Sequence, residues 1–279
     1  MLGEAFYKQF KDDYLLRCTD IDVNDSWLSY LDMRDYDAYR EDVMRFHPDY
    51  LFHLGAYTDL EFCETYPELT YMTNTLTVEN AVYIANELDI PILYIGTGGV
   101  FDGNKDLYDD WDTPSPMGVY ARSKYMGEKF VLDNATRYLI CRAGWMMGGG
   151  RKDKKFVAKV LKQINSGAKI LNVVDDKEGT PTYTHDFAAN VRILLERELW
   201  GLYNMVCSGL TSRFEVAEEI VNILGVDVKV NPVGSDFFQR EYFACRPKSE
   251  MLLNRKLNLR GLNRMRDWKT TLKEYLNET

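Results

Sequence analysis

The chain has 279 residues, enough for one large α/β domain or for a domain with a smaller lobe, and its 46% hydrophobic and 28% charged residues are ordinary for a folded protein. A formal net charge of −9 argues against binding to nucleic acid or to anionic lipid. No apolar run reaches the roughly 20 residues needed to span a bilayer, and no signal-peptide pattern opens the chain. We therefore expect a cytoplasmic protein with a small-molecule partner.

The five cysteines are scattered and the three histidines are far apart in the sequence. Neither a disulfide framework nor a metal site is predicted from spacings of this kind.

In the first half, apolar runs rich in β-branched and aromatic residues alternate with helical patterns. The runs span 14–19, 49–56, 91–97 and 138–144, and the helical patterns span 35–46, 75–89 and 123–135. Such runs suit strands that are buried on both faces of a parallel sheet. The alternation predicts right-handed crossovers and a doubly wound α/β core.

The rhythm changes after residue 148. Helices are predicted at 156–166, from His185 with Thr184 as N-cap, at 212–224 and at 268–277, with extended pieces at 169–174, 201–208 and 227–233. We expect residues 1–148, with a return segment at about 185–208, to form the main domain. Residues 149–184 and 209–279 would form a smaller C-terminal lobe, and the cleft between the two is the default ligand site.

Tyr120 and Lys124 lie one helical turn apart at the start of a predicted helix. An ammonium group held near a phenol favours the phenolate and lowers the pKa of the tyrosine, so the pair suits proton transfer. The alternative is a solvated helix face, because this spacing is common in helices.

Further motifs in order along the chain carry a resemblance. They are "GAYTDLEFCE" (55–64), "YIGTGGVFDG" (94–103), "SPMGVYARSKYMGE" (115–128), "CRAGWMMG" (141–148), "GTPTYTHDFA" (179–188) and "RPKSEMLLNRKL" (246–257). Together they resemble the extended short-chain dehydrogenase/reductase family, in its dTDP-4-dehydrorhamnose reductase-like, sugar-nucleotide-binding branch. The resemblance implies a Rossmann-like dinucleotide-binding domain and a substrate-binding lobe.

The same resemblance implies catalytic roles for three residues. Tyr120 would donate a proton to a sugar carbonyl, Lys124 would tune the phenol and hold the nicotinamide ribose, and Thr97 would donate a hydrogen bond to the developing alkoxide.

The cofactor implied is NAD or NADP. Asp20 or Asp22 follows a predicted strand, and a carboxylate there repels a 2′-phosphate and so favours NAD, with a solvated loop as the alternative. Asp32 and Met33 would contact adenine. By the resemblance, the other cofactor-binding positions are Gly3, Gly55, Ala56, Tyr57, Ala143 and Gly144.

Two segments depart from the family pattern. "MLGEAFYKQF" resembles only the end of the G-x-x-G-x-x-G turn, with Gly3 as its third glycine, so we expect the first strand and the start of that turn to lie upstream, in a polypeptide that begins roughly ten residues earlier. Gly96, Thr97, Gly98 and Gly99 stand where family reductases usually carry Ser-Thr-Asp-Tyr. Because glycines cannot move a proton, sugar dehydration is disfavoured.

The implied partner is a nucleotide-diphosphate sugar. Lys155, in a basic loop, and Arg246 are candidates to bind the diphosphate, with a solvated turn as the alternative for the loop. Asn74 is a further substrate-binding candidate, or it braces a helix. A homodimer is a possible assembly.

Three functions remain open at this point. The leading hypothesis is an NAD(P)-dependent reductase of the keto group of a nucleotide-linked 4-keto-6-deoxysugar. A sugar-nucleotide epimerase would use the same Tyr120 and Lys124. The third is a non-catalytic, dinucleotide-binding regulatory subunit.

Overall fold

A computed structural model describes residues 1–278 and has a four-stranded parallel sheet at its centre. The strand order is β10-β5-β4-β3, formed by Gly201–Asn204, Tyr138–Ala143, Ile92–Thr97 and Leu51–His53. Strands β4 and β5 end in register, with Thr97 beside Ala143. Side chains of the central strands are almost fully buried, as expected for continuous apolar runs covered on both faces.

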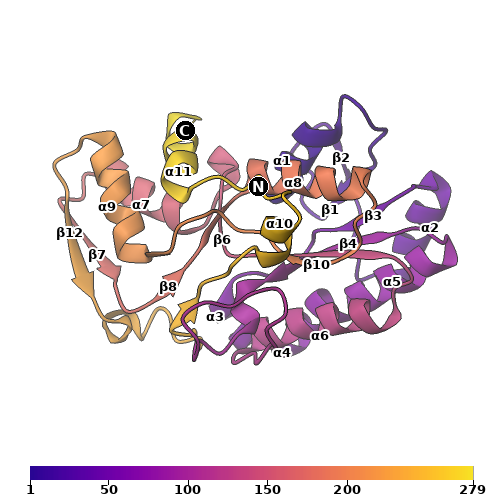
Figure 1. Cartoon of the computed structure of the whole chain (residues 1–279), viewed down its shortest axis with the longest axis horizontal. Coiled ribbons are helices and arrows are strands. Elements are labelled where there is room, and N and C mark those ends of the chain that lie inside the picture. Colours follow the sequence, from indigo (N-terminus) through magenta and orange to yellow (C-terminus); the bar gives the residue numbers. More distant parts are fainter. Residues whose placement is uncertain (279) are drawn as a thin grey trace.

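Helices cover both faces of this sheet (Figure 1). Residues of α2 (Tyr36–Phe46), α5 (Thr77–Glu87) and α6 (Val119–Asn134) pack with Ile92 and Tyr94 on one face. Residues of α1 (Leu2–Phe10) and α8 (Thr184–Glu196) pack with Leu93 and Ile95 on the other. Successive residues of β4 therefore feed opposite cores, as the pleat of a strand requires. The chain is α/β with a Rossmann-like parallel sheet, as predicted.

A second parallel pair, β1 (Cys18–Asp20) and β2 (Leu28–Tyr30), forms a sheet of its own. The sequence run at 14–19 predicted β1 too early, and β2 was not predicted, because three residues are too few to show a period. The additional strand expected upstream of Met1 lies outside the sequence and stays a prediction.

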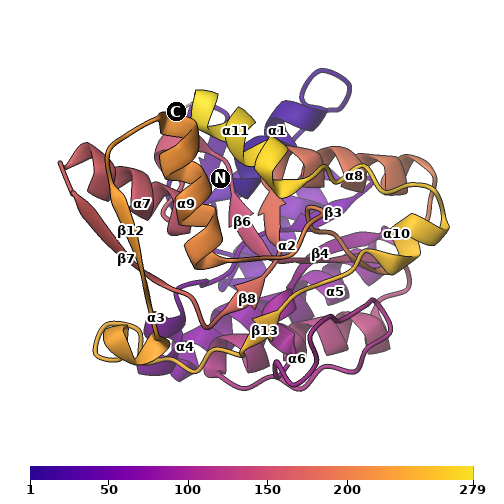
Figure 2. The same ribbon diagram turned by 60° about the vertical axis from the view of Figure 1, so that its left-hand side comes forward.

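The second half adds smaller sheets, three further long helices and one short helix (Figure 2). The paired strands are β6 with β9 (Trp145–Met147, Pro181–Tyr183), β7 with β12 (Ile170–Val174, Lys229–Val233), and β11-β8-β13 (Thr211–Ser212, Glu178–Gly179, Ser249–Glu250). The helices are α7 (Phe156–Asn165), α9 (Arg213–Leu224), α10 (Arg255–Leu259) and α11 (Trp268–Glu278). In the first half, α3 (Leu60–Thr65), α4 (Pro67–Tyr71) and a π-helical turn (Met72–Leu76) precede α5.

Local rules explain several boundaries. Ser212 caps α9 through a capping box with Glu215, which satisfies two backbone donors. Two predicted starts are wrong. Helix α8 begins at Thr184 itself, whose buried hydroxyl has no hydrogen-bond partner among residues 1–278, and α6 begins at Val119 rather than 123.

Strand β10 returns to the first sheet beside β5, whereas β7 and β12 pair elsewhere. The predicted domain boundaries stay a prediction. No helix within residues 1–278 has the length and apolar character to cross a membrane.

Candidate active site

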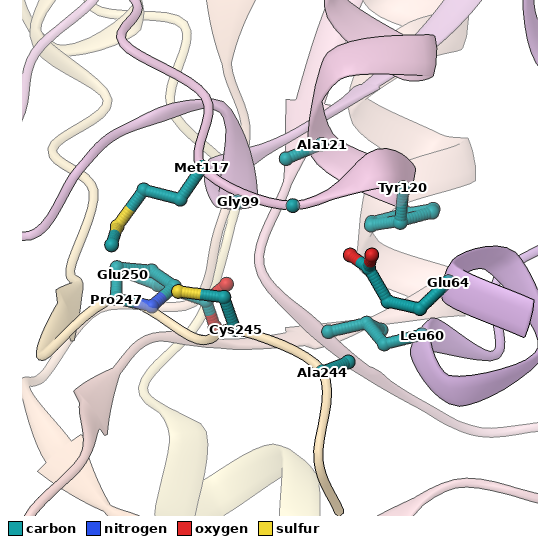
Figure 3. Close-up of a pocket in the computed structure, with 11 residues that line it drawn as sticks. Leu60, Glu64, Gly99, Met117, Tyr120, Ala121, Ala244, Cys245, Pro247 and Glu250 are labelled. Carbon is teal, nitrogen blue, oxygen red and sulfur yellow. The ribbon is translucent and has the colours of Figure 1, made fainter. Parts of the chain in front are cut away.

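A narrow pocket lies at the N-terminal end of α6, where Tyr120 faces a loop from the C-terminal part of the chain (Figure 3). In the close-up, Tyr120 and Glu64 lie on one side and Met117, Cys245 and Pro247 on the other. Its lining residues are Leu60, Glu64, Gly99, Met117, Gly118, Tyr120, Ala121, Ala244, Cys245, Pro247 and Glu250. The cavity volume is about 10 Å³, the space of about one water molecule.

The position of Tyr120 is set by how α6 begins. Gly118 is the N-cap residue, and the Val119 N–H donates to Glu64 Oε1 at 2.7 Å. A carboxylate at this end also suits the helix dipole. The buried residues of α6 include Lys124, Gly127, Glu128 and Val131, spaced as one helical face. A Cβ on Gly127 would lie 2.9 Å from the Asn74 carbonyl oxygen, so glycine allows the close packing of α6.

The side chains of Thr97 and Tyr120 both lie close to Gly99. Thr97 ends β4, and its Oγ1 accepts a hydrogen bond from the Gly99 N–H at 3.2 Å. A Cβ built on Gly99 would lie 3.5 Å from Thr97 Oγ1 and 4.0 Å from Tyr120 Cε1. The structure thus brings the two residues together, as predicted from their motifs.

The electrostatic expectation for Tyr120 is wrong in this structure. Burial raises the pKa of Tyr120 to about 12, and the hydrogen bond with Thr97 offsets this only in part. Lys124 is buried with its Nζ 4.2 Å from the centroid of the Tyr94 ring, and burial lowers its own pKa to about 7. A lysine that has lost part of its charge, and that lies over another ring, does not stabilise the Tyr120 phenolate.

The acidic cofactor candidates lie near strand ends. Asp20 is the last residue of β1 and is exposed, with one carboxylate oxygen accepting the Asp22 N–H at 3.0 Å. Asp32, just after β2, accepts hydrogen bonds from the Arg34 guanidinium at 2.6 to 3.1 Å, and Arg34 lowers the pKa of that carboxyl group. Arg34 was not predicted, and it competes with any ligand of Asp32.

The glycines near these carboxylates differ in what they contact. A Cβ on Gly55 would lie 2.7 Å from Met33 Cε, so Met33 packs directly on the backbone that leads to Ala56 and Tyr57. A Cβ on Gly3, near the start of α1, would meet no atom within 4 Å. Close packing explains the glycine at position 55. At position 3 there is open space, so packing within the chain does not explain that glycine.

Gly144 follows Ala143, the last residue of β5, and approaches β9 closely. A Cβ there would lie 2.1 Å from the Thr180 carbonyl oxygen, and the Gly144 N–H donates to Thr182 Oγ1 at 2.9 Å. Glycine at 144 is therefore explained by contacts within the chain.

Asn74 departs from its predicted substrate role. Its side chain is fully buried, accepts the Tyr57 N–H at 2.8 Å, and donates to the Tyr57 carbonyl at 2.9 Å and to Ser123 Oγ at 3.1 Å. All of these bonds are internal, so Asn74 joins the segment after β3 to α6, which is the bracing alternative.

None of the three cationic candidates is among the residues that line the pocket. Lys155 Nζ donates to Thr58 Oγ1 at 2.7 Å, and burial lowers its pKa. The Arg246 guanidinium donates to Glu61 Oε2 at 3.0 Å and to the Ala244 carbonyl. Arg213, a weaker substrate-side candidate from the sequence with an exposed side chain as the alternative, stacks 4.3 Å from the centroid of the Trp145 ring, and burial lowers its pKa to about 10.

Sequence reasoning missed two pocket carboxylates, Glu64 and Glu250. The only signal for Glu64 was its place in the "GAYTDLEFCE" motif, and the only one for Glu250 was its place in "RPKSEMLLNRKL". Neither motif shows that the side chain reaches the pocket, because tertiary folding brings position 250 there. Among residues 1–278, no group of three or more His, Cys, Asp or Glu side chains is arranged to hold a metal ion.

Known proteins match this chain over most of its length. It is 31% identical to a dTDP-4-dehydrorhamnose reductase of Mycobacterium tuberculosis over 242 residues, 84% of this chain and 78% of that protein. A dTDP-4-dehydrorhamnose reductase from Clostridium acetobutylicum superposes with a TM-score of 0.86 at 28% identity, covering 99% of this chain and 95% of that one. A Bacillus anthracis dTDP-4-dehydrorhamnose reductase, solved in complex with NADP, gives 0.83 at 28% identity, covering 90% of each chain.

The family model described as the RmlD substrate binding domain matches residues 1–279. With that match and the similarity over most of its length, this chain belongs to the RmlD family.

Proposed function

We propose that this protein is a nicotinamide-dinucleotide-dependent reductase of the keto group of a nucleotide-linked 4-keto-6-deoxysugar. The observation that carries the proposal is the convergence of Thr97 and Tyr120 on one point of a pocket, with Lys124 one turn further along α6. Membership of the RmlD family and the reductase relatives support it.

Tyr120 acts as the proton donor. With a pKa of about 12, its phenol stays protonated at neutral pH and is available to protonate the carbonyl oxygen of the sugar. The Thr97 hydroxyl lies close enough to donate a second hydrogen bond to the same oxygen as negative charge develops there. When bound, the nicotinamide supplies the hydride.

The cofactor would lie along the edge where β1, β3, β4 and β5 end. The open space over Gly3, at the start of α1, fits a pyrophosphate that needs close approach to backbone N–H groups. Asp20 would meet the adenosine ribose, Asp32 and Met33 the adenine, and Gly55, Ala56 and Tyr57 the pyrophosphate side. Lys124, Ala143 and Gly144 would line the nicotinamide side.

The nucleotide diphosphate would be held by cations on the far side of the pocket. Arg213, Arg246 and Lys155 come from three separate segments, and guanidinium groups bind phosphate oxygens in a forked geometry. Arg246 would exchange its contact with Glu61 for a phosphate.

The test is to incubate the protein with NADH or NADPH and a panel of dTDP-, UDP- and GDP-linked 4-keto-6-deoxysugars. The proposal expects stoichiometric oxidation of the reduced cofactor with at least one sugar. Conversion of a sugar without net cofactor oxidation would identify the epimerase, and cofactor binding without any turnover would identify the regulatory subunit. The preference for NAD over NADP, the cytoplasmic location and the homodimer stay predictions.

A further inference from the structure

Glu250 places a carboxylate in the pocket that holds Tyr120. It is the second residue of β13, paired in register with Gly179 of β8, and it lines the pocket from the side opposite to α6. Its Oε2 accepts a hydrogen bond from Trp145 Nε1 at 2.6 Å. The indole thus fixes the carboxylate from behind.

The other oxygen points to the reacting groups. A Cβ built on Gly99 would lie 3.1 Å from Glu250 Oε1, on the same spot that is 3.5 Å from Thr97 Oγ1. Contacts of 3.1 Å are tighter than nearly all real Cβ contacts, so the carboxylate occupies space that a larger residue at 99 would take. Among the side chains that the structure describes, those of residues 1–150 and 152–278, none donates a hydrogen bond to Oε1.

Two other ionisable groups, Arg213 and Tyr120, lie near the Glu250 carboxylate. The Arg213 guanidinium stacks on the same indole that donates to Glu250, and the two charged groups are close enough for Glu250 to raise the pKa of Arg213 against the effect of burial. Glu250 likewise adds to the raised pKa of Tyr120. A fixed carboxylate with one free acceptor beside a proton donor is suited to bind a hydroxyl group.

We propose that Glu250 contacts the sugar and determines specificity, with Oε1 accepting a hydrogen bond from the hydroxyl on the carbon next to the reacting carbonyl. In a 4-keto-6-deoxysugar that carbon is C3, because C5 carries the ring oxygen and the C6 methyl. This inference rests on the proposed function. A sugar without the C3 hydroxyl leaves Oε1 of the half-buried carboxylate without a donor, which disfavours the binding of that sugar and its transition state.

The test compares a nucleotide-linked 4-keto-6-deoxysugar with its 3-deoxy counterpart. We expect the wild-type protein to prefer the hydroxylated sugar by about 10- to 100-fold in kcat/KM. Glu250→Leu loses that preference, through weaker binding and a lower kcat/KM of the hydroxylated sugar. Glu250→Gln keeps the contact with Trp145 and retains a reduced preference. Equal losses on both sugars in Glu250→Leu would overturn the inference.

Two further variants make the result independent of folding defects. Gly99→Ala leaves Glu250 in the chain but displaces its carboxylate, so it should also lower the preference. Glu178 lies on the neighbouring strand and does not line the pocket. Glu178→Gln should therefore leave kcat/KM unchanged for both sugars.

Binding of the two sugars, measured by titration calorimetry on the same variants, separates the two proposals. A wild-type preference in binding that Glu250→Leu abolishes supports the Glu250 contact even if no reduced cofactor is oxidised, an outcome that would refute only the reductase. Binding without any preference, or no binding of either sugar, overturns the contact.

Discussion

Tyr120 is a protonated phenol at neutral pH, as an ordinary tyrosine is, and burial raises its pKa further, to about 12. A buried phenol gives up its proton only to an atom on which negative charge develops. In the proposed reaction this atom is the carbonyl oxygen of the sugar, which would lie beside the Thr97 hydroxyl. The neighbouring Glu250 makes the phenolate still less favourable. A phenol with a raised pKa gives up its proton only to a strong base, such as the alkoxide that forms on the sugar as the hydride is added.

Tyr120→Phe removes the donor and keeps the ring. We expect kcat for sugar reduction to fall by about two or more orders of magnitude with little change in cofactor or sugar binding. Steady-state kinetics together with calorimetry measure both quantities. An unchanged kcat would exclude Tyr120 as the acid.

Lys124 predicts a specific dependence of stability on pH. Its pKa falls from 10.5 in the unfolded chain to about 7 in the native protein because of burial, with Glu128 opposing the shift. Between pH 7 and 10.5 the unfolded chain binds the proton and the native protein does not. The free energy of unfolding therefore rises with pH in this window, by up to about 1.4 kcal/mol per pH unit from this group.

Urea unfolding at several pH values from 6 to 10 checks this. Lys124→Met removes the titration, so the stability of the wild-type protein relative to this variant should rise through the window and level off below pH 7. Lys129→Met, on the exposed face of the same helix, is the matched control. Parallel curves for wild type and Lys124→Met would contradict the shift.

At the scale of elements, β5 and α6 are joined by a buried ion pair. Arg142 Nη2 donates to Glu128 Oε1 at 2.6 Å and Arg142 Nε donates to Oε2 at 3.0 Å, and neither side chain is more than 3% exposed. A Cβ on Gly96 of β4 would lie 2.8 Å from Arg142 Cγ, so glycine at 96 makes room for the pair. The pair fixes the helix that carries Tyr120 and Lys124.

Arg142→Met leaves the Glu128 charge buried without its partner, and we expect the free energy of unfolding to drop by about 3–5 kcal/mol. Replacing both residues, Arg142→Met with Glu128→Leu, removes the unpaired charge and should recover most of the loss. Urea unfolding of the two variants at pH 7 measures the difference. A double variant as unstable as the single one would show that the pair matters through packing instead.

The sequence predicted elements whose pattern is long enough to repeat. β4, β5, α2 and α7 lie within one or two residues of their predicted ranges, because buried strands and amphipathic helices carry their own signal. The start of α6 was wrong since the N–H of its first residue, Val119, donates to Glu64, which is 55 residues away in sequence. Strands of two or three residues, such as β2 and β13, exist through pairing alone.

In the candidate site, too, residues on elements with a clear sequence pattern could be predicted, and residues placed by tertiary contacts could not. Thr97, Tyr120 and Lys124 lie on β4 and α6 and were found from motifs. Glu250 reaches the pocket, and Arg213 reaches Trp145, from elements whose placement depends on the whole fold. The lowered pKa of Lys124 was also out of reach, because burial is a property of packing and not of spacing.

For the whole molecule, one hydrophobic core connects the two halves of the chain. Phe6 and Phe10 of α1, Leu139 of β5, Val216 of α9 and Leu272 of α11 belong to the same buried cluster. The proposed substrate lobe therefore does not have a core separate from that of the sheet. The cavity of about 10 Å³ is too small for a sugar ring, so some part of the pocket wall has to move to admit a sugar. Because the core is shared, we expect the segment 244–247, which lines the pocket, to move rather than a whole lobe.

A shared core predicts one cooperative unfolding transition. Urea curves followed by far-UV circular dichroism should coincide with the loss of hydrogen-exchange protection in both α1 and α9, which share this core. Two separated transitions, with α9 opening first, would show that the C-terminal part is an independent domain.

The stacking of Trp145 also has a practical consequence. Its indole lies between a guanidinium and the carboxylate that faces the pocket, so its excited state responds to the charges on both sides. A ligand that binds against Glu250 changes the electric field at the indole. The fluorescence of Trp145 should therefore shift in wavelength or fall in intensity when the ligand binds. The protein thus carries its own label-free reporter, and a Trp145→Phe variant supplies the blank.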